Sequence, residues 1–257
     1  MIGRLGDPDR FEVEASDGKI GNLSDVYVDD CDWCVRYLVI DIGDWISDRK
    51  VLISPEEIDD MDWHNEKLKL NVSKKKVEES PEAEAERPVS KKHLVALHNY
   101  YGWSAYWPGG MPAGPPPTGI PPPTPSEVGE VGSENLGDEE EPMHLRSAEE
   151  IMGYHIHATD GRIGHLEDLL IEDEENVPEN RWMVRYFIVN TRDWLPGRDV
   201  IVSPDWIEDI DWLSSHIGVD VSKEDIKNSP EYNPEEELTR DYEVILYENL
   251  DKTGYWL

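Results

Sequence analysis

The sequence predicts a mainly β protein with two small β-barrels, each followed by a short α-helical C-terminal extension. Apolar residues alternate with a period of two, which is typical of half-buried strands. Turn residues interrupt this alternation every few residues, and the whole pattern occurs twice in the 257 residues. Each copy spans about 100 residues, the ordinary size of one small domain.

An internal repeat organises the chain. Residues 17–25 recur as 160–168, an offset of 160 − 17 = 143, and residues 33–40 recur as 182–189, an offset of 182 − 33 = 149. The 149 − 143 = 6 additional residues of the second copy fall in the acidic loop at 172–178, where an insertion costs little. The recurring positions, which we interpret as architectural, are Gly21 and Gly164, Trp33 and Trp182, Arg36 and Arg185, Trp45 and Trp194, Pro55 and Pro204, and Trp63 and Trp212.

The repeat defines the domain organisation. We predict a first module at 1–107, a linker at 108–142 and a second module at 143–257. The linker is first rich in proline and glycine and then acidic, so it favours extended, self-repelling chain over helix or sheet. We interpret it as a spacer, and a ligand for a proline-recognising groove is the alternative.

Within the first module, alternating apolar runs predict short strands at 11–15, 23–28, 33–40, 51–53 and 68–72. Gly18 and Gly161, each after an aspartate, indicate hairpin turns because glycine accepts a positive φ. Gly21 and Gly164 indicate a bulge or a tight bend in the strand that follows. Short strands divided by turns favour a small closed barrel, since closure removes exposed sheet edges.

Helices are predicted after the strands. Ser73 and Ser222 are expected to cap short helices, which Pro81 and Pro230 end. Residues 91–101 form an amphipathic pattern. Its predicted buried face comprises Leu94, Leu97, His98 and Tyr101. In the second copy, residues 241–250 are expected to present Tyr242, Ile245, Leu246 and Asn249.

Both copies end in aromatic residues. These are Tyr101, Trp103, Tyr106 and Trp107 in the first copy and Tyr255 and Trp256 in the second. An exposed cluster of this size is unusual on a monomer, so we predict an interface, either between the modules or between two chains in a homodimer. The alternative is that the rings fold back onto their own barrels. We expect the repeated tryptophans at 45, 63, 194 and 212 to pack against the barrel or its following helix.

The net charge restricts the classes of partner. With 24 basic and 57 acidic side chains, the formal charge is 24 − 57 = −33. Such a chain repels nucleic acid and anionic lipid, so neither is a predicted partner. No apolar run is long enough to insert into a membrane, and the N-terminus lacks the apolar core of a signal peptide, so we expect a soluble, cytoplasmic protein. The charge fits either solubility or adaptation to high salt.

One C-x-x-C motif, Cys31 and Cys34, suits a redox pair or half of a zinc site. A zinc site needs further ligands, and His64 is the nearest downstream histidine. The second copy has Met183 where the first has Cys34, so we interpret the pair as structural. His155 and His157 share one strand face, a spacing that suits a metal, and incidental surface residues are the interpretation we favour.

Charged residues also have two interpretations. The acidic loops at 29–32 and 172–175 could hold Ca²⁺ weakly, but they lack the EF-hand spacing, so we favour solvated loops. Arg36 and Arg185 lie inside apolar strands and therefore need carboxylate partners. The recurring Asp25 and Asp168 are the candidates. We find no phosphate loop and no nucleophile or metalloprotease motif, and predict no catalytic residue, cofactor or metal.

The order of three motifs carries a resemblance to a known family. In the first copy they are Asp17–Gly21, Val35–Ile40 and Val51–Pro55 followed by Ile58, and in the second Asp160–Gly164, Val184–Val189 and Val200–Pro204 followed by Ile207. This order resembles the PRC-barrel family, which is named from the cytoplasmic domain of the photosynthetic reaction centre H subunit. The resemblance covers roughly residues 10–80 and 153–230, and implies small, mostly antiparallel barrels that serve protein–protein contact rather than catalysis.

We therefore expect a non-catalytic interaction or scaffold protein with an unidentified protein partner. Two alternatives stay open. The first is a metal-binding or enzymatic protein that uses the barrel as a frame. The second is an accessory of a membrane electron-transfer complex, by analogy with the protein that names the family.

Overall fold

The computed structural model describes residues 1–43, 49–81, 89–107, 144–173, 182–192, 194–195 and 198–256. These residues form two compact units. The N-terminal unit holds the described residues from 7 to 146, and the C-terminal unit holds residues 1–6 and those from 147 onward. The predicted linker at 108–142 and the predicted structural residue Trp45 lie outside the described residues.

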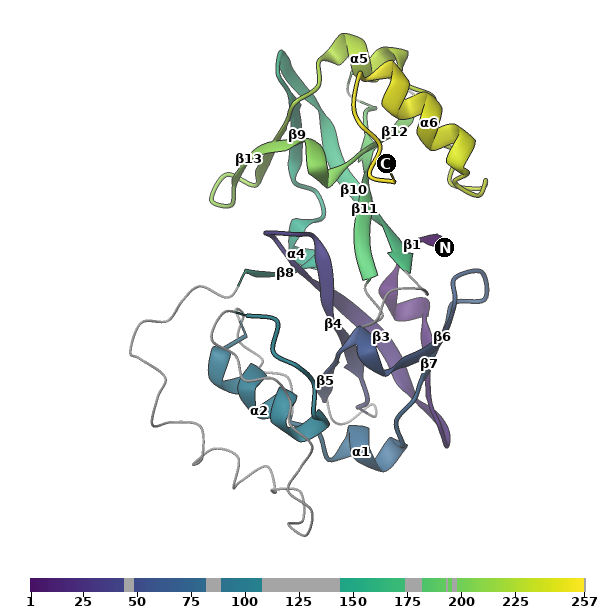
Figure 1. The fold of residues 1–257 in the computed structure, drawn as a ribbon, viewed down its shortest axis with the longest axis vertical. Coiled ribbons are helices and arrows are strands. Elements are labelled where there is room, and N and C mark those ends of the chain that lie inside the picture. The colour runs from purple at the N-terminus through teal and green to yellow at the C-terminus, as the bar shows by residue number, and fades with distance from the viewer. Residues whose placement is uncertain are drawn as a thin grey trace. The chain divides into compact units, whose positions relative to one another are not determined.

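The strands of the N-terminal unit pair in the order β6-β7-β2-β3-β4-β5 (Figure 1). They are β2 (Glu12–Ala15), β3 (Gly18–Asp29), β4 (Cys34–Asp41), β5 (Lys50–Ile53), β6 (Ile58–Asp62) and β7 (Lys67–Leu70). The β2–β7 pair is parallel, and the other pairs along this path are antiparallel. A further strand, β8 (Leu145–Ser147), pairs with β3.

The C-terminal unit repeats this order as β13-β14-β9-β10-β11-β12. Its strands are β9 (His155–Ala158), β10 (Gly161–Asp173), β11 (Trp182–Asn190), β12 (Asp199–Val202), β13 (Ile207–Asp211) and β14 (His216–Val219). The β14–β9 pair is parallel, as is its counterpart in the other unit. The additional strand here is β1 (Ile2–Arg4), which pairs with β10.

The mainly β prediction is confirmed, whereas closure into a barrel is not found in the strand pairing of the described residues. In each unit the path is open, and its two end strands are joined by a 3-10 turn, η2 (Pro55–Glu57) or η3 (Pro204–Trp206). Ser54 and Ser203 cap these turns. Because proline has no N–H to donate and a 3-10 turn redirects the chain, one strand does not continue the ladder of the other.

The repeated glycines occupy positions that a side chain would disrupt. Gly18 and Gly161 have φ of 132° and 130° in the predicted hairpin turns. An added Cβ would lie 2.0 Å from the carbonyl oxygen of Asp41 at Gly21, and 2.1 Å from that of Asn190 at Gly164. Register shifts occur beside both glycines. The predicted bulge is therefore confirmed, and the close approach of a neighbouring strand explains why each position needs glycine.

The predicted helices form, with one correction. α1 (Lys74–Glu78) and α5 (Lys223–Asn228) begin after the capping Ser73 and Ser222. α2 spans Lys91–Tyr101 and buries its predicted face. Two more helices are α4 (Ala148–Ile151) and α6 (Arg240–Asn249).

The face predicted for α6 is correct at Leu246 and wrong at Ile245 and Asn249. Glu243, Leu246 and Tyr247 are buried, whereas Ile245 is 51% exposed and Asn249 is exposed. The buried face follows α2 at the offset of 149, so that Glu243 takes the place of Leu94. Because the buried position 243 holds a charged residue, the pattern of apolar residues did not indicate this face.

The central strands supply the core, and the repeated tryptophans border it. β4 is buried on both faces, and Trp33 and Trp182 are buried. Trp63 and Trp212 are half-buried. Trp63 makes an edge contact to Phe11 at 5.9 Å between ring centroids, and Trp212 a tilted contact to Tyr154 at 6.0 Å. Trp194 is half-buried beneath the Lys223 ammonium. The three half-buried tryptophan rings therefore pack against the surface of their units rather than in the core.

Candidate functional site

The end of β10 receives an arm from the start of the chain. The arm is the segment 1–6, and its strand β1 pairs Gly3 with Ile171. The Asp173 amide donates to the carbonyl of Met1 at 3.0 Å, and the Leu5 amide donates to that of Leu169 at 3.0 Å. Leu5 is only 1% exposed. The arm thus adds both main-chain hydrogen bonds and a buried apolar side chain to the C-terminal unit.

Carboxylates fasten this arm. Asp168 is buried, forms an ion pair with Arg4, and accepts from the Gly6 amide at 3.0 and 3.1 Å. Asp173 forms an ion pair with the Met1 ammonium group. A buried carboxylate needs charged or N–H partners, and the arm supplies the charged partner of Asp168, beside the N–H that Leu169 donates at 2.8 Å.

The end of β3 receives a corresponding arm, the segment 144–146, in the N-terminal unit. The Asp30 amide donates to the carbonyl of His144 at 2.7 Å, and Leu145 is buried. The Asp30 carboxylate lies 2.8 Å from Nδ1 of His144 and 2.7 Å from Nε of Arg146. This arm, like the first, combines main-chain pairing, an apolar residue and a cation on a carboxylate.

The two arms are equivalent in the repeat. His144 follows Met1 by 143 residues, and Asp173 follows Asp30 by 143, the offset of the first repeated block. Each unit therefore binds, at the same edge, the segment that precedes the other module in sequence. Residues 1–6 thus lie in the C-terminal unit, and residues 144–146 lie in the N-terminal unit. We call the receiving ends of β3 and β10 the acceptor edges.

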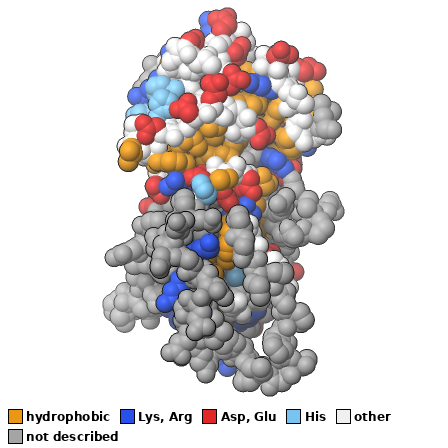
Figure 2. All heavy atoms as spheres, turned by 60° about the vertical axis from the view of Figure 1, so that its left-hand side comes forward, with side chains coloured by type: hydrophobic (Ala, Val, Ile, Leu, Met, Phe, Trp, Pro, Cys, Tyr) orange, Lys and Arg blue, Asp and Glu red, His pale blue; other side chains and the backbone are white. Residues whose placement is uncertain are grey.

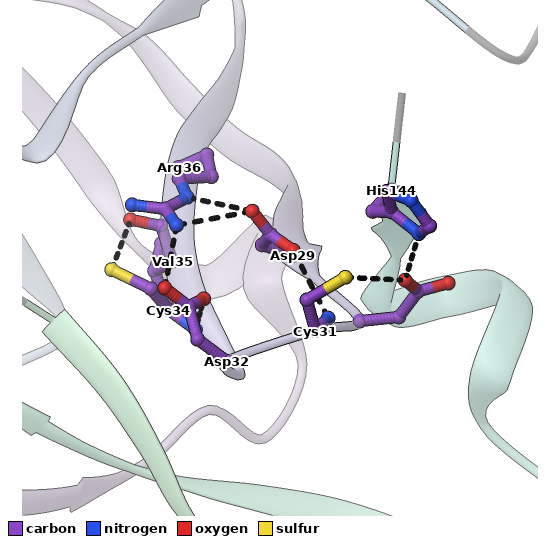
Figure 3. Close-up of polar contacts among 8 residues, drawn as sticks. Asp29, Cys31, Asp32, Cys34, Val35, Arg36 and His144 are labelled. Atoms are coloured by element: carbon purple, nitrogen blue, oxygen red, sulfur yellow. Dashed lines mark hydrogen bonds and ion pairs between the residues drawn. The ribbon is translucent and has the colours of Figure 1, made fainter. Parts of the chain in front are cut away.

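Next to each acceptor edge lies one of the repeated arginines. Arg36 is held by Asp29 at 3.0 Å and Asp32 at 2.6 Å (Figure 3), and Arg185 by Glu172. The prediction of Asp25 and Asp168 as partners is corrected by these pairs. Asp29 and Glu172 lie near the ends of β3 and β10, the strands that pair with β4 and β11, so each arginine reaches a carboxylate on the neighbouring strand. Arg36 also reaches Asp32 in the loop after β3.

The aromatic extensions fold back onto their own units. Tyr106 lies 4.4 Å from the Arg36 guanidinium and Tyr255 lies 4.2 Å from that of Arg185, distances typical of cation–π contacts. Tyr101 and Trp103 are buried and stack at 4.2 Å between centroids. The remaining rings of the predicted interface, those of residues 106, 107, 255 and 256, are half-buried. The structure thus has the predicted alternative to an interface, in which the rings fold back onto their own module.

Beneath the rings, the two units differ in chemistry. In the N-terminal unit the Tyr37 hydroxyl lies 2.6 Å from Nε2 of His98, and burial lowers the pKa of His98 to about 4. In the C-terminal unit the buried Glu243 accepts from Tyr186 at 2.7 Å and Tyr255 at 2.9 Å. Arg240 lies 3.0 Å from the same carboxylate. The Tyr37 and Tyr186 hydroxyl groups and the Glu243 carboxylate thus have hydrogen-bond partners, as a packed interior requires.

The C-x-x-C cysteines do not act as a pair. Cys34 is buried and its Sγ lies 3.8 Å from the carbonyl of Val35, whereas Cys31 is exposed in the loop (Figure 3). Desolvation and then Asp29 and Asp30 raise the pKa of Cys31, which disfavours the reactive thiolate. The sequence did not connect Cys31 with His144, which the fold brings to the same carboxylate as Cys31.

Of the histidines considered as ligands, His64 and His155 are exposed and His157 is half-buried. His157 stacks on His216 at 4.0 Å between ring centroids, and desolvation followed by His216 lowers its pKa. Among the described residues, neither His64 nor the pair His155 and His157 joins a group of three metal-ligating side chains.

Figure 2 shows acidic side chains dispersed over the face of the C-terminal unit that it displays, interspersed with Lys and Arg.

Comparison with known proteins identifies one domain. The family model of the PRC-barrel domain matches residues 4–77, which confirms the resemblance for that segment. The match covers the first copy. That the second copy resembles the same family, and that the chain resembles the reaction centre H subunit, stay predictions. No curated protein matches the chain. Among the described residues, no helix is long and apolar enough to cross a membrane.

Proposed function

We propose that the chain is a non-catalytic scaffold protein, built from two PRC-barrel modules, that binds extended peptide segments at its acceptor edges. The observation that carries this proposal is the uptake of a sequence-remote arm at the same edge of both units. Addition of a strand to a sheet edge is a general mode of peptide recognition, in which main-chain hydrogen bonds supply affinity and side-chain pockets supply specificity.

The arms define the chemistry of the segment that fits. Each contains an arginine directed at a carboxylate of the receiving unit, Arg4 at Asp168 or Arg146 at Asp30. Each also buries a leucine, residue 5 or 145. We infer that the preferred occupant is a short, basic and partly apolar strand. Occupancy of the edges by the chain's own arms favours assembly between modules, and between chains when an arm exchanges between two copies.

The test uses the whole chain with a specific protease site placed in the linker at 108–142. After cleavage, the two fragments should co-elute with the mass of the intact chain, because each fragment contributes an arm to the other. Arg4→Ala combined with Leu5→Ala should weaken this complex by at least about tenfold, since an ion pair and a buried side chain are lost. Fragments that separate fully after cleavage would exclude the proposal.

A matched control is available in the same part of the chain. Arg10 is exposed, and its nearest carboxylates, those of Asp7 and Glu66, lie 3.7 and 3.8 Å away. Arg10→Ala should therefore leave the complex unchanged, because exposed ion pairs contribute little. Synthetic peptide of residues 1–8 in excess should accelerate separation of the cut chain, whereas a scrambled peptide should not.

A further inference from the structure

Three chemically different metal-binding side chains meet where the second arm joins the N-terminal unit. Asp30 and Cys31 lie in the loop after β3, and His144 comes from the arm. Nδ1 of His144 is 2.8 Å from Oδ1 of Asp30, and Sγ of Cys31 is 3.9 Å from the same oxygen. The three ligand atoms all lie within 4.8 Å of one another. Figure 3 shows Cys31 and His144 directed toward this shared carboxylate.

The surrounding structure holds these groups in place. The Asp30 amide donates to the carbonyl of His144 at 2.7 Å, so the backbone fixes the imidazole next to the loop. The Cys31 amide donates to Asp29 at 3.0 Å, and Asp29 is itself bound by Arg36. Such second-layer contacts orient a ligand before an ion arrives.

We propose that Asp30, Cys31 and His144 bind one divalent cation of the zinc type. Zinc bonds of about 2.0 to 2.3 Å place neighbouring tetrahedral ligands about 3.3 to 3.8 Å apart. The Sγ–Oδ1 distance of 3.9 Å is already close to that separation, and the Nδ1–Oδ1 distance of 2.8 Å has to lengthen by about 0.5 Å. A small rotation of the half-exposed imidazole supplies this change.

The donor set selects the ion. A thiolate and an imidazole favour Zn²⁺ or Co²⁺ over Ca²⁺ and Mg²⁺, which prefer oxygen ligands only. Arg146 holds Oδ2 of Asp30 at 2.7 Å and leaves Oδ1 to the ion. Cys31 is exposed and the His144 side chain is 51% exposed, so an ion and a fourth ligand, water, can enter from solvent.

The second unit provides an internal comparison. The residue equivalent to Asp30 is Asp173, and it binds the Met1 ammonium group in place of an imidazole. The chain has two cysteines, at 31 and 34, so the C-terminal unit has no thiol. The proposed site is therefore restricted to the N-terminal unit, and the expected stoichiometry is one ion per chain.

The test adds Co²⁺ and then Zn²⁺ to the full-length, reduced protein. One equivalent of Co²⁺ should give the visible absorption of a tetrahedral ion together with a thiolate-to-cobalt charge-transfer band, and one equivalent of Zn²⁺ should abolish both. Cys31→Ser and His144→Gln should each weaken binding by at least about tenfold, because each removes one ligand. Zn²⁺ should also slow alkylation of Cys31 in the native protein but not in the His144→Gln variant.

Two control variants complete the design. Cys34→Ala removes the other thiol of the motif, and His64→Gln removes a histidine of the same unit that lies outside the cluster, so neither should change the cobalt spectrum. Circular dichroism establishes that every variant is folded. The proposal is overturned by a cobalt spectrum without the charge-transfer band, by full binding in Cys31→Ser, or by loss of binding in Cys34→Ala.

Discussion

Leu5→Ala should destabilise the C-terminal unit, although Leu5 lies at the opposite end of the sequence from most of that unit. The side chain is 1% exposed, and the residue's amide donates to Leu169. Truncation of a buried leucine costs about 2–5 kcal/mol, and a short edge strand can partly close the cavity, so we expect about 2–3 kcal/mol. At about 1.4 kcal/mol per factor of ten, amide exchange limited by unfolding of this unit should accelerate roughly 30- to 150-fold.

The assay is native-state hydrogen exchange with mass spectrometry, which reports each unit separately. Leu5→Ala should reduce protection in β10 and β11 first, and the reciprocal Leu145→Ala should reduce it first in β3 and β4. Leu213 is 100% exposed in the C-terminal unit, so Leu213→Ala should change neither. Loss of protection in β3 and β4 on truncation of Leu5, with β10 and β11 unchanged, would refute the assignment of the arm.

Three further predictions concern the interiors of the units. Gly164→Ala should lower the free energy of unfolding by more than about 2 kcal/mol in denaturant titration, because the added Cβ would lie 2.1 Å from a backbone oxygen; a neutral result would contradict the close approach. His98 has its pKa lowered from 6.5 to about 4 in the folded state, so the unfolded state binds more protons between these values. Stability should therefore fall by up to about 3 kcal/mol as the pH drops from 6.5 to 4, and His98→Gln should flatten this dependence in melts across that range. Glu243→Leu, which copies Leu94 of the other unit, should cost about 2–4 kcal/mol because it leaves the buried Tyr186 hydroxyl and the half-buried Tyr255 hydroxyl without their acceptor; a more stable variant would show that packing outweighs this network.

Local signals in the sequence were sufficient for most elements. The capping Ser73 and Ser222 and the amphipathic run at 91–101 led to helices that the structure contains at those places. The glycines at 21 and 164 led to bulges. These predictions are correct because each feature depends on residues that are near in sequence. A cap depends on the first turn of its helix, and a bulge depends on a residue without a side chain.

The features that depend on remote contacts were missed. The arginine partners were assigned by recurrence to Asp25 and Asp168. The ion pairs in the structure instead join Arg36 and Arg185 to carboxylates near the ends of the neighbouring strands. The arms had a weak signal, since Ile2 and Leu145 continue the offset of 145 − 2 = 143. This signal cannot select between the units, because both acceptor edges offer the same main-chain groups in the same register.

The arrangement of the arms is the central claim, and nuclear Overhauser contacts between backbone protons test it directly. In the full-length protein, Gly3 should show cross-strand contacts to Ile171, and the His144 segment should show them to the region of Asp30. The alternative arrangement, with each arm on the unit that follows it in sequence, uses the same edges. Contacts from Gly3 to the end of β3, and from the His144 segment to the end of β10, would contradict the account.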